Sequence, residues 1–171
     1  MNILELFSGT GSIGKVALEF GHHVISLNKD MEADIKTDIL NWDYKTYDPG
    51  YFDLIWASPP CTEYSVAKTT GTKQIEQANE IVQRTLEIIE YLQPTWFIIE
   101  NPQTGLLKKP SIMTDLPGLT YRKRTRLWNN ILTWTPRPLC RKDCNAMTED
   151  RKRHKDTAQR MPSGKKKTLG K

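Results

Sequence analysis

The sequence predicts an α/β fold in which a mostly parallel sheet is flanked by helices. Apolar runs of strand length alternate with two stretches of helical periodicity, and Gly, Pro or polar residues separate them. This alternation is typical of βαβ units. The 171 residues leave room for one such domain and an appendage.

The first βαβ pattern opens the chain. Residues 1–7 (MNILELF) are predicted to form a strand, and apolar positions 13, 16, 17 and 20 mark one face of a helix. Gly21 is expected to end that helix, as a glycine just past a helix end often does. A second strand is expected at 23–27 (HVISL), followed by a polar, turn-rich stretch over 28–50.

The second pattern covers residues 52–99. Strands are predicted at 52–57 (FDLIWA) and 96–99 (WFII), with a helix over 74–92 that ends before Pro94. The expected buried stripe of this helix consists of Ile75, Ala78, Val82, Leu86 and Ile89. Beyond it, TRLW (125–128) and ILTW (131–134) suggest one or two more strands, whereas the stretch between residues 100 and 122 looks short enough to lack one.

Charge divides the chain. Residues 1–120 hold 9 basic and 16 acidic side chains, a net −7, and residues 121–171 hold 16 basic and 4 acidic ones, a net +12. The basic C-terminal third indicates DNA or another polyanion as partner, with a solvated tail as the alternative. We expect a catalytic domain over 1–135 and a basic, partly disordered appendage over 136–171. Three cysteines and no long apolar run favour a cytoplasmic protein.

Three unusual clusters follow predicted strands: FSGTG (7–11), SPPC (58–61) and ENP (100–102). Ligands of open α/β sheets bind beyond the carboxyl ends of the strands, so these clusters are expected to meet at one edge. Gly9 and Gly11 would let the backbone approach a ligand closely, and residues 9–14 fit G-x-G-x-x-G. A dinucleotide site also needs an acid after the second strand. Asn28 stands there, with Asp30 as a shifted alternative.

Cys61 and Glu100 are the candidate chemical groups. Two prolines stiffen the loop before Cys61, which suits a nucleophile, although a small buried filler is the commoner role of a lone cysteine. Glu100 follows four apolar residues, so partial desolvation is expected. Such a carboxyl group can bind a ring nitrogen and an exocyclic amine together, or cap the loop through backbone N–H groups.

Taken together, the clusters resemble the DNA cytosine-5 methyltransferase family. Residues 7–11 resemble its Phe-x-Gly-x-Gly cofactor motif, Pro60-Cys61 its nucleophile motif, and Glu100-Asn101 its Glu-Asn motif. Residues 122–126 (RKRTR) resemble its Gln-x-Arg-x-Arg motif, with Arg122 in place of Gln. The resemblance runs from about residue 2 to residue 130 and favours a compact phage- or virus-type branch.

The resemblance implies a Rossmann-like fold, S-adenosylmethionine as methyl donor and DNA as substrate. The Cys61 thiolate would add to carbon 6 of a flipped or single-stranded cytosine. Glu100 would hold N3 and the amino group, and Arg124 or Arg126 would bind the carbonyl at position 2. The residues implied for the cofactor are Phe7, Ser8, Gly9, Thr10, Gly11, Asn28, Asp38, Ile39 and Pro59.

Several readings stay open. About 40 residues follow Trp128, without an apolar closing segment, so a partner chain or missing segment is expected to complete target recognition. The alternatives are a catalytically degenerate nucleic-acid-binding module and a cytosine-5 RNA methyltransferase. An amino-group methyltransferase would need an acid or Asn and an aromatic residue where Ser58 and Cys61 stand.

The basic end holds one further pattern. Cys140-x3-Cys144, with His154 ten residues further on, could hold zinc together with a fourth ligand. The spacing is unusual and no fourth ligand is obvious, so two loop thiols without metal are the favoured interpretation.

Overall fold

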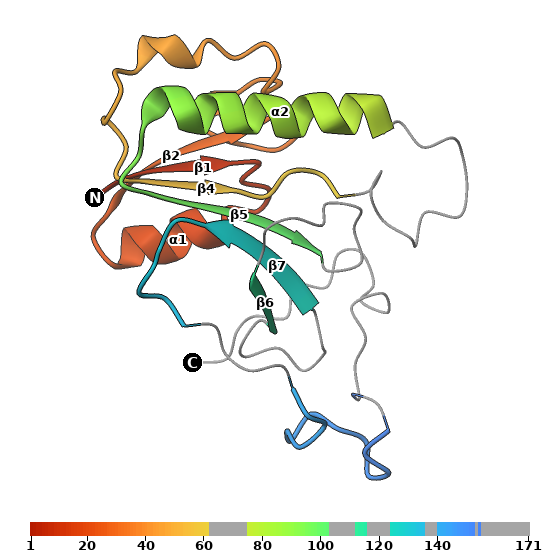
Figure 1. Ribbon diagram of the computed structural model, residues 1–171. Coiled ribbons are helices and arrows are strands. Elements are labelled where there is room, and N and C mark those ends of the chain that lie inside the picture. The colour runs from red at the N-terminus through yellow and green to blue at the C-terminus, as the bar shows by residue number, and fades with distance from the viewer. Residues whose placement is uncertain (62–74, 103–111, 116–123, 136–139, 153, 155–171) are drawn as a thin grey trace.

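The structure, a computed structural model, describes residues 1–61, 75–102, 112–115, 124–135, 140–152 and 154. The described strands form one seven-stranded sheet of order β3-β2-β1-β4-β5-β7-β6, and α1 and α2 cover its opposite faces (Figure 1). This arrangement confirms the predicted α/β fold. In the part of the chain that the structure describes, no helix has both the length and the apolar composition to span a membrane.

The described elements alternate along the first hundred residues, as expected. The strands are β1 (Asn2–Leu6), β2 (His23–Asn28), β3 (Ile35–Lys36), β4 (Leu54–Ala57), β5 (Trp96–Pro102), β6 (Ile112–Asp115) and β7 (Arg124–Asn129). The helices are α1 (Ser12–Glu19), the short 3-10 helix η1 (Tyr44–Thr46) and α2 (Ile75–Leu92). Strands β1 to β5 pair in parallel, whereas β7 runs antiparallel to both β5 and β6.

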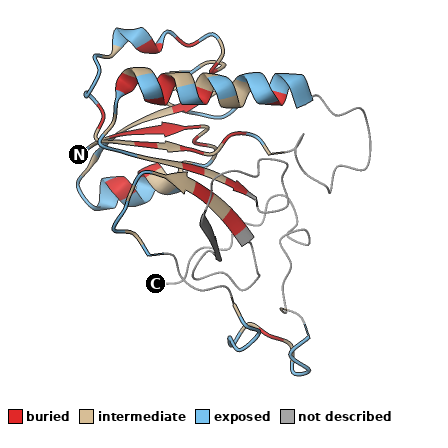
Figure 2. Ribbon diagram, in the orientation of Figure 1, coloured by how far each residue is buried: buried red, intermediate tan, exposed pale blue. Residues whose placement is uncertain are grey.

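The main core lies between the sheet and α2 (Figure 2). Leu4 of β1, Ile55 of β4, and Ile88 and Leu92 of α2 are completely buried there. Alternate residues of each strand point to this face, which is why the apolar strand runs could be recognised from sequence.

The end of α1 confirms the expected role of Gly21. Gly21 adopts φ 76°, its N–H donates to Leu18 O at 2.9 Å, and the N–H of His22 donates to Ala17 O at 3.0 Å. This pair of bonds satisfies the last carbonyls of the helix, as in a Schellman motif.

The expected buried stripe of α2 was partly wrong. Leu86 is 45% exposed and Ile75 is 36% exposed, whereas Thr85 is completely buried. A buried threonine is tolerated here because its hydroxyl donates to Ile81 O at 2.8 Å, within the helix itself.

The strand expected at 131–134 is also wrong. The side chain of Asn129 accepts a hydrogen bond from Ile131 N, and a turn follows in which Trp134 N donates to Ile131 O. Strand β7 instead pairs with β6, which lies in the stretch that looked too short for a strand. The polar region 28–50 likewise contains β3 and η1, and Asp43 caps η1 by accepting from Lys45 N.

Candidate active site

The three sequence clusters do meet at one edge of the sheet. Strands β1, β4 and β5 are parallel neighbours, so the segments at their carboxyl ends lie side by side (Figure 1). The N–H of Ser58 donates to Leu6 O at 3.3 Å, which joins the segment after β4 to the end of β1.

The glycine turn after β1 has an unusual backbone. Phe7, Gly9 and Gly11 all adopt positive φ, at 60°, 56° and 68°. For a phenylalanine this conformation costs roughly 1–3 kcal/mol, which is typical of a strained functional turn. The turn is tied down by bonds from Ser8 N to Leu27 O and from Gly11 N to Ser8 O. The Ser8 hydroxyl is buried and has no hydrogen-bond partner among the described residues.

Glu5 supports the start of helix α1, directly after this turn, from inside the sheet. The N-cap residue of α1 is Gly11, which has no side chain to cap the helix. The Glu5 carboxylate instead accepts from Gly14 N at 3.0 Å and Ile13 N at 3.3 Å. Burial raises the pKa of Glu5, while these two N–H groups favour its charged form. A Cβ on Gly14 would lie 2.7 Å from Glu5 Oε2, so any larger residue would displace the Glu5 carboxylate from these two N–H groups. Glu5 was not expected from the sequence, although a carboxylate inside an apolar strand was a usable signal.

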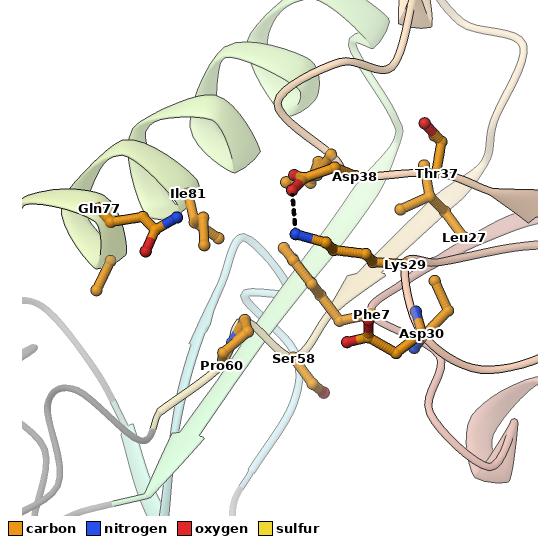
Figure 3. A pocket seen from close by; sticks show the side chains of 13 residues that line it. Phe7, Leu27, Lys29, Asp30, Thr37, Asp38, Ser58, Pro60, Gln77 and Ile81 are labelled. Atoms are coloured by element: carbon orange, nitrogen blue, oxygen red, sulfur yellow. Dashed lines mark hydrogen bonds and ion pairs between the residues drawn. The ribbon is translucent and has the colours of Figure 1, made fainter. Parts of the chain in front are cut away.

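Next to the turn lies a cavity of about 510 Å³ (Figure 3). Its size suits a nucleoside-sized ligand. Four residues expected to bind the cofactor line it: Phe7, Asn28, Asp38 and Ile39. The shifted alternative Asp30 lines it as well, together with residues that were not expected to bind the cofactor: Leu27, Lys29, Thr37, Ser58, Pro60, Gln77, Ala78 and Ile81.

Two polar residues of the cavity lining, Asp38 and Asn28, have different tasks. Asp38 accepts from Leu40 N at 3.0 Å and from Lys29 Nζ at 2.8 Å, and the Lys29 ammonium lowers the pKa of Asp38. Asn28 Oδ1 accepts from the N–H groups of Asp30 and Met31, both at 2.9 Å. The Asn28 carbonyl therefore shapes the turn that carries Asp30 along the cavity wall.

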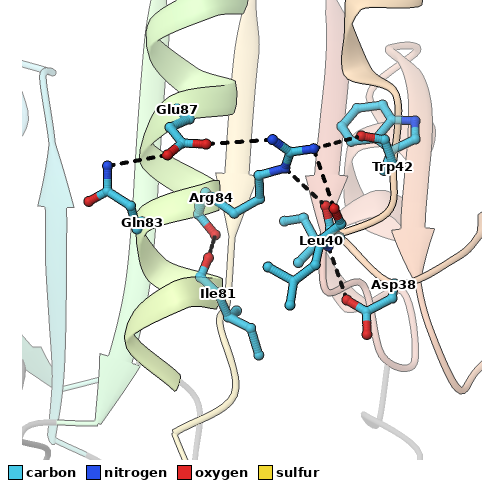
Figure 4. Close-up of polar contacts among 9 residues, drawn as sticks. Asp38, Leu40, Trp42, Ile81, Gln83, Arg84 and Glu87 are labelled. Atoms are coloured by element: carbon cyan, nitrogen blue, oxygen red, sulfur yellow. Dashed lines mark hydrogen bonds and ion pairs between the residues drawn. The ribbon is translucent and has the colours of Figure 1, made fainter. Parts of the chain in front are cut away.

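Arg84 of α2 holds the segment after Asp38 in place (Figure 4). Its guanidinium donates to the carbonyl oxygens of residues 39, 40 and 42, each at 3.4 Å. It also lies 4.8 Å from the ring centre of Tyr44 and 3.5 Å from Glu87. No local pattern in the sequence indicates this role, because the carbonyl partners lie more than 40 residues earlier in the chain.

The Pro-Cys loop is fixed from two sides. Trp56 Nε1 donates to Ser58 Oγ at 2.9 Å, and Asn101 Nδ2 donates to Pro59 O at 3.2 Å. Asn101 is completely buried. Cys61 follows directly, partly buried and outside any disulfide. Side chains of β4 and β5 thus position the loop that carries the candidate nucleophile.

Strand β7 brings the arginine motif beside the Glu-Asn motif. Arg126 pairs with Asn101 in register, and Leu127 pairs with Glu100. Opposed residues of an antiparallel pair share a face, so Arg126 shares the face of Asn101 and Glu100 alternates to the other face. Glu100 and Arg126 are both partly buried. Arg124 opens β7, and its side chain lies outside the described part of the structure.

The remaining predicted cofactor residues lie around the cavity rather than in its lining. Ser8, Gly9 and Gly11 form the turn beside it, and Pro59 is buried in the Pro-Cys loop. Thr10 is exposed, with its hydroxyl 3.1 Å from Ser12 Oγ.

Known proteins match this chain in sequence. The model of the C-5 cytosine-specific DNA methylase family matches residues 1–113. The chain belongs to this family. A protein of Frog virus 3 (isolate Goorha), described as "Probable DNA (cytosine-5)-methyltransferase", is 36% identical over 165 residues, which cover 84% of this chain and 77% of the relative.

Solved structures agree with this family at the level of the fold. A protein encoded within an E. coli prophage and assigned as a DNA modification methyltransferase has a TM-score of 0.59 at 16% identity. The match covers 82% of this chain and 52% of that one, so the chain spans about half the length of this structural relative. Family membership confirms the predicted resemblance, the Rossmann-like fold, the class of DNA (cytosine-5)-methyltransferases and S-adenosylmethionine as methyl donor.

Proposed function

We propose that this chain methylates carbon 5 of cytosine in DNA through a covalent adduct with Cys61. The observation that supports this most directly is the place of the Pro-Cys loop. Ser58 and Pro60 line the cavity, and Cys61 follows at the same edge of the sheet. A thiol in a loop held by Asn101 and Trp56 next to a cofactor-sized cavity suits a nucleophile that must meet its substrate in one geometry.

The residues around the cavity fit S-adenosylmethionine. Phe7, Ile39 and Ile81 offer apolar walls, and the buried Ser8 hydroxyl beside the glycine turn is left for a ligand to satisfy. When bound, S-adenosylmethionine supplies an electrophilic methyl group. The strained turn at Phe7 is held by the bonds of Ser8 N to Leu27 O and of Gly11 N to Ser8 O.

Cys61 makes the cytosine ring reactive. Carbon 5 is a poor nucleophile until the thiolate adds to carbon 6, which forms an S–C6 bond and moves the electron pair toward carbon 5. This electron pair would form the bond to the methyl group, while the S–CH3 bond breaks and S-adenosylhomocysteine leaves. A base then removes the proton of carbon 5. The electrons of that C–H bond restore the C5–C6 double bond and expel the Cys61 thiolate.

Neighbouring strands supply the groups that hold the target base. Glu100 at the end of β5 binds N3 and the amino group, and stabilises the charge that develops there. We assign the carbonyl at position 2 to Arg126 of β7, or to Arg124 on the same strand, which would reach the base from the other face of the sheet than Glu100. Asn101 touches neither the base nor the cofactor in this scheme, and positions the Pro-Cys loop through Pro59 O.

The cofactor ribose is assigned to Asp30. Asn28 occupies the position of the family's ribose-binding acid, but its carbonyl oxygen already accepts two backbone N–H groups. Asp30 is the next acid along the chain and lines the cavity. Asp38, which Lys29 holds in its charged form, is assigned to the adenine end of S-adenosylmethionine.

DNA is assigned to the basic end. Among the described residues of this end, Arg141, Lys142, Arg151 and Lys152 are exposed. Lys and Arg side chains that neutralise phosphates give an affinity that falls with added salt. This proposal includes the division into a catalytic domain over 1–135 and a basic appendage over 136–171. It also includes a partner chain or segment that completes target recognition.

The test replaces the nucleophile and follows two quantities. Cys61→Ala should abolish methyl transfer to cytosine in DNA and leave the Kd for S-adenosylmethionine within about twofold, because no cofactor contact is assigned to the thiol. Methyl transfer retained by this variant would overturn the covalent mechanism. If the wild type transferred methyl groups to RNA alone, the cytosine-5 RNA methyltransferase would be favoured instead. If it bound DNA without any methyl transfer, the catalytically degenerate nucleic-acid-binding module would be favoured.

A further inference from the structure

A second cluster of reactive side chains lies in the basic end, outside the active site. Cys140, Cys144 and His154 bring three ligand atoms within 4.8 Å of one another. The two sulfur atoms are 3.7 Å apart, and His154 Nε2 lies 3.6 Å from Cys140 Sγ and 3.3 Å from Cys144 Sγ. The sulfur separation excludes a disulfide, whose S–S bond measures about 2.05 Å.

These separations match the edges of a tetrahedral zinc site. Zinc binds thiolate at about 2.3 Å and imidazole at about 2.0–2.1 Å. Tetrahedral angles then place two sulfur atoms about 3.8 Å apart and a sulfur and a nitrogen about 3.5 Å apart. All three observed distances lie within about 0.3 Å of these values, so one ion at the centre would reach every ligand at its normal bond length.

The local backbone is shaped around the two sulfur atoms. Lys142 N donates to Cys140 Sγ at 3.3 Å, a hydrogen bond that favours the thiolate. Lys142 adopts φ 69°, and Arg151 on the other side of the loop adopts φ 51°. Left-handed conformations cost energy for residues with long side chains and persist only where other interactions require them.

Apolar burial is a weak source of order for this loop. Between Cys140 and His154 the only apolar side chains apart from Cys144 are Ala146 and Met147, and Met147 alone is buried. The described pairing consists of one isolated bridge between Met147 and His154. Fixing the backbone costs about 1–2 kcal/mol per residue, which so little buried surface does not offset.

We infer that Cys140, Cys144 and His154 bind one zinc ion, and that this ion folds the loop over residues 140–154. Among the described residues, no fourth ligand atom joins the cluster. The chain's other cysteine is Cys61, and its other histidines, His22 and His23, stand at the start of β2. The fourth ligand is therefore an oxygen atom, from solvent or a carboxylate.

The experiment measures metal in the full chain, produced in zinc-supplemented medium and purified under reducing conditions. Elemental analysis should find about one zinc per chain in the wild type and in Cys61→Ser, and less than about a fifth of that in Cys144→Ser and His154→Ala. Cys61→Ser is the matched control, because it removes a thiol outside the cluster. It also separates the two proposals, since it should lose methyl transfer while it keeps zinc.

A second measurement uses the wild type alone, so its result does not depend on whether the variants fold. The wild type, stripped of metal with a chelator and refilled with Co²⁺, should show the strong visible bands of tetrahedral Co²⁺ and thiolate-to-metal charge transfer. The inference would be overturned if the wild-type protein contained no zinc and, after Co²⁺ addition, showed only the weak bands of octahedral Co²⁺. Equal loss of zinc from Cys61→Ser and Cys144→Ser would also overturn it.

Discussion

The active-site edge has two sides that are built in different ways. The cofactor side, formed mainly by the segments after β1, β2 and β3, is a cavity whose lining combines apolar side chains with the acidic groups of Asp30 and Asp38. The nucleophile side, formed by the ends of β4, β5 and β7, has a loop whose position depends on single buried hydrogen bonds, above all from Asn101 to Pro59.

This difference indicates that binding and chemistry can be separated by mutation. On the cofactor side many contacts contribute to binding, so the loss of one should lower the affinity for S-adenosylmethionine only moderately. On the nucleophile side a small displacement of the loop misplaces the thiol, and a misplacement of about 1 Å can cost about 100-fold in rate. Three substitutions test the comparison.

Asn101→Ala should have the largest effect. It removes the amide that holds Pro59 O and leaves that carbonyl without this partner, so kcat for methyl transfer should fall about 100-fold. The Kd for S-adenosylmethionine should change less than about threefold, as measured by calorimetry. The free energy of unfolding should drop by about 1–3 kcal/mol.

Asn130→Ala is the control for this loss of stability. Asn130 also binds backbone groups at β5, namely Phe97 N and Thr95 O, but at the opposite end of the strand. It should lose stability while kcat stays near the wild-type value. A similar fall in kcat for both variants, or a large rise in Kd for Asn101→Ala, would break the separation between the two sides.

Asp30→Asn should have an intermediate effect on the cofactor side. A hydrogen bond to a charged group is worth about 1.5–3 kcal/mol, so the Kd for S-adenosylmethionine should rise about tenfold or more. Saturating cofactor should restore most of the wild-type kcat. Asp48→Asn, at an exposed position outside the cavity lining, should leave the Kd unchanged. An unchanged Kd for Asp30→Asn would reassign the ribose contact.

Arg84→Lys should have the smallest effect. Lysine cannot reach the three carbonyl groups with one fixed fork of donors, and each bond is long at 3.4 Å. We expect thermal or denaturant unfolding to show a loss of about 1 kcal/mol, and the cofactor Kd to rise about twofold. Gln83→Ala, next to it on α2 and exposed, should show neither change. A loss of kcat at saturating cofactor would contradict a role confined to the cofactor side.

Local patterns explain why much of the fold could be predicted. The start of α1, its end at Gly21 and the buried runs of β1 and β4 depend on residues close in sequence. Strand β6 is different, because IMTD contains only two apolar residues and is ordered by pairing with β7, which follows later in the chain. Leu86 was misassigned because periodicity alone does not reveal that Thr85 can satisfy its own hydroxyl.

The same distinction applies to the site. Motif residues such as Phe7, Cys61 and Glu100 are proposed for the site from their order along the chain, and the structure brings their segments to one edge of the sheet. The residues that support them could not be predicted, since their partners are remote or their type is misleading. Arg84 binds carbonyls more than 40 residues away, and Glu5 is a charged residue inside an apolar strand. Asn28 was expected at the cofactor, yet its oxygen serves the turn before Asp30.

The most direct test of the central claim is to trap the covalent adduct. The wild-type protein is incubated with labelled S-adenosylmethionine and DNA containing 5-fluorocytosine, whose fluorine cannot leave as a proton does. We predict a denaturation-resistant protein–DNA complex that carries the label, maps to Cys61 by peptide mass spectrometry and is missing for Cys61→Ala. Methyl transfer to ordinary cytosine without any such complex, or a complex that forms equally with Cys61→Ala, would contradict the account.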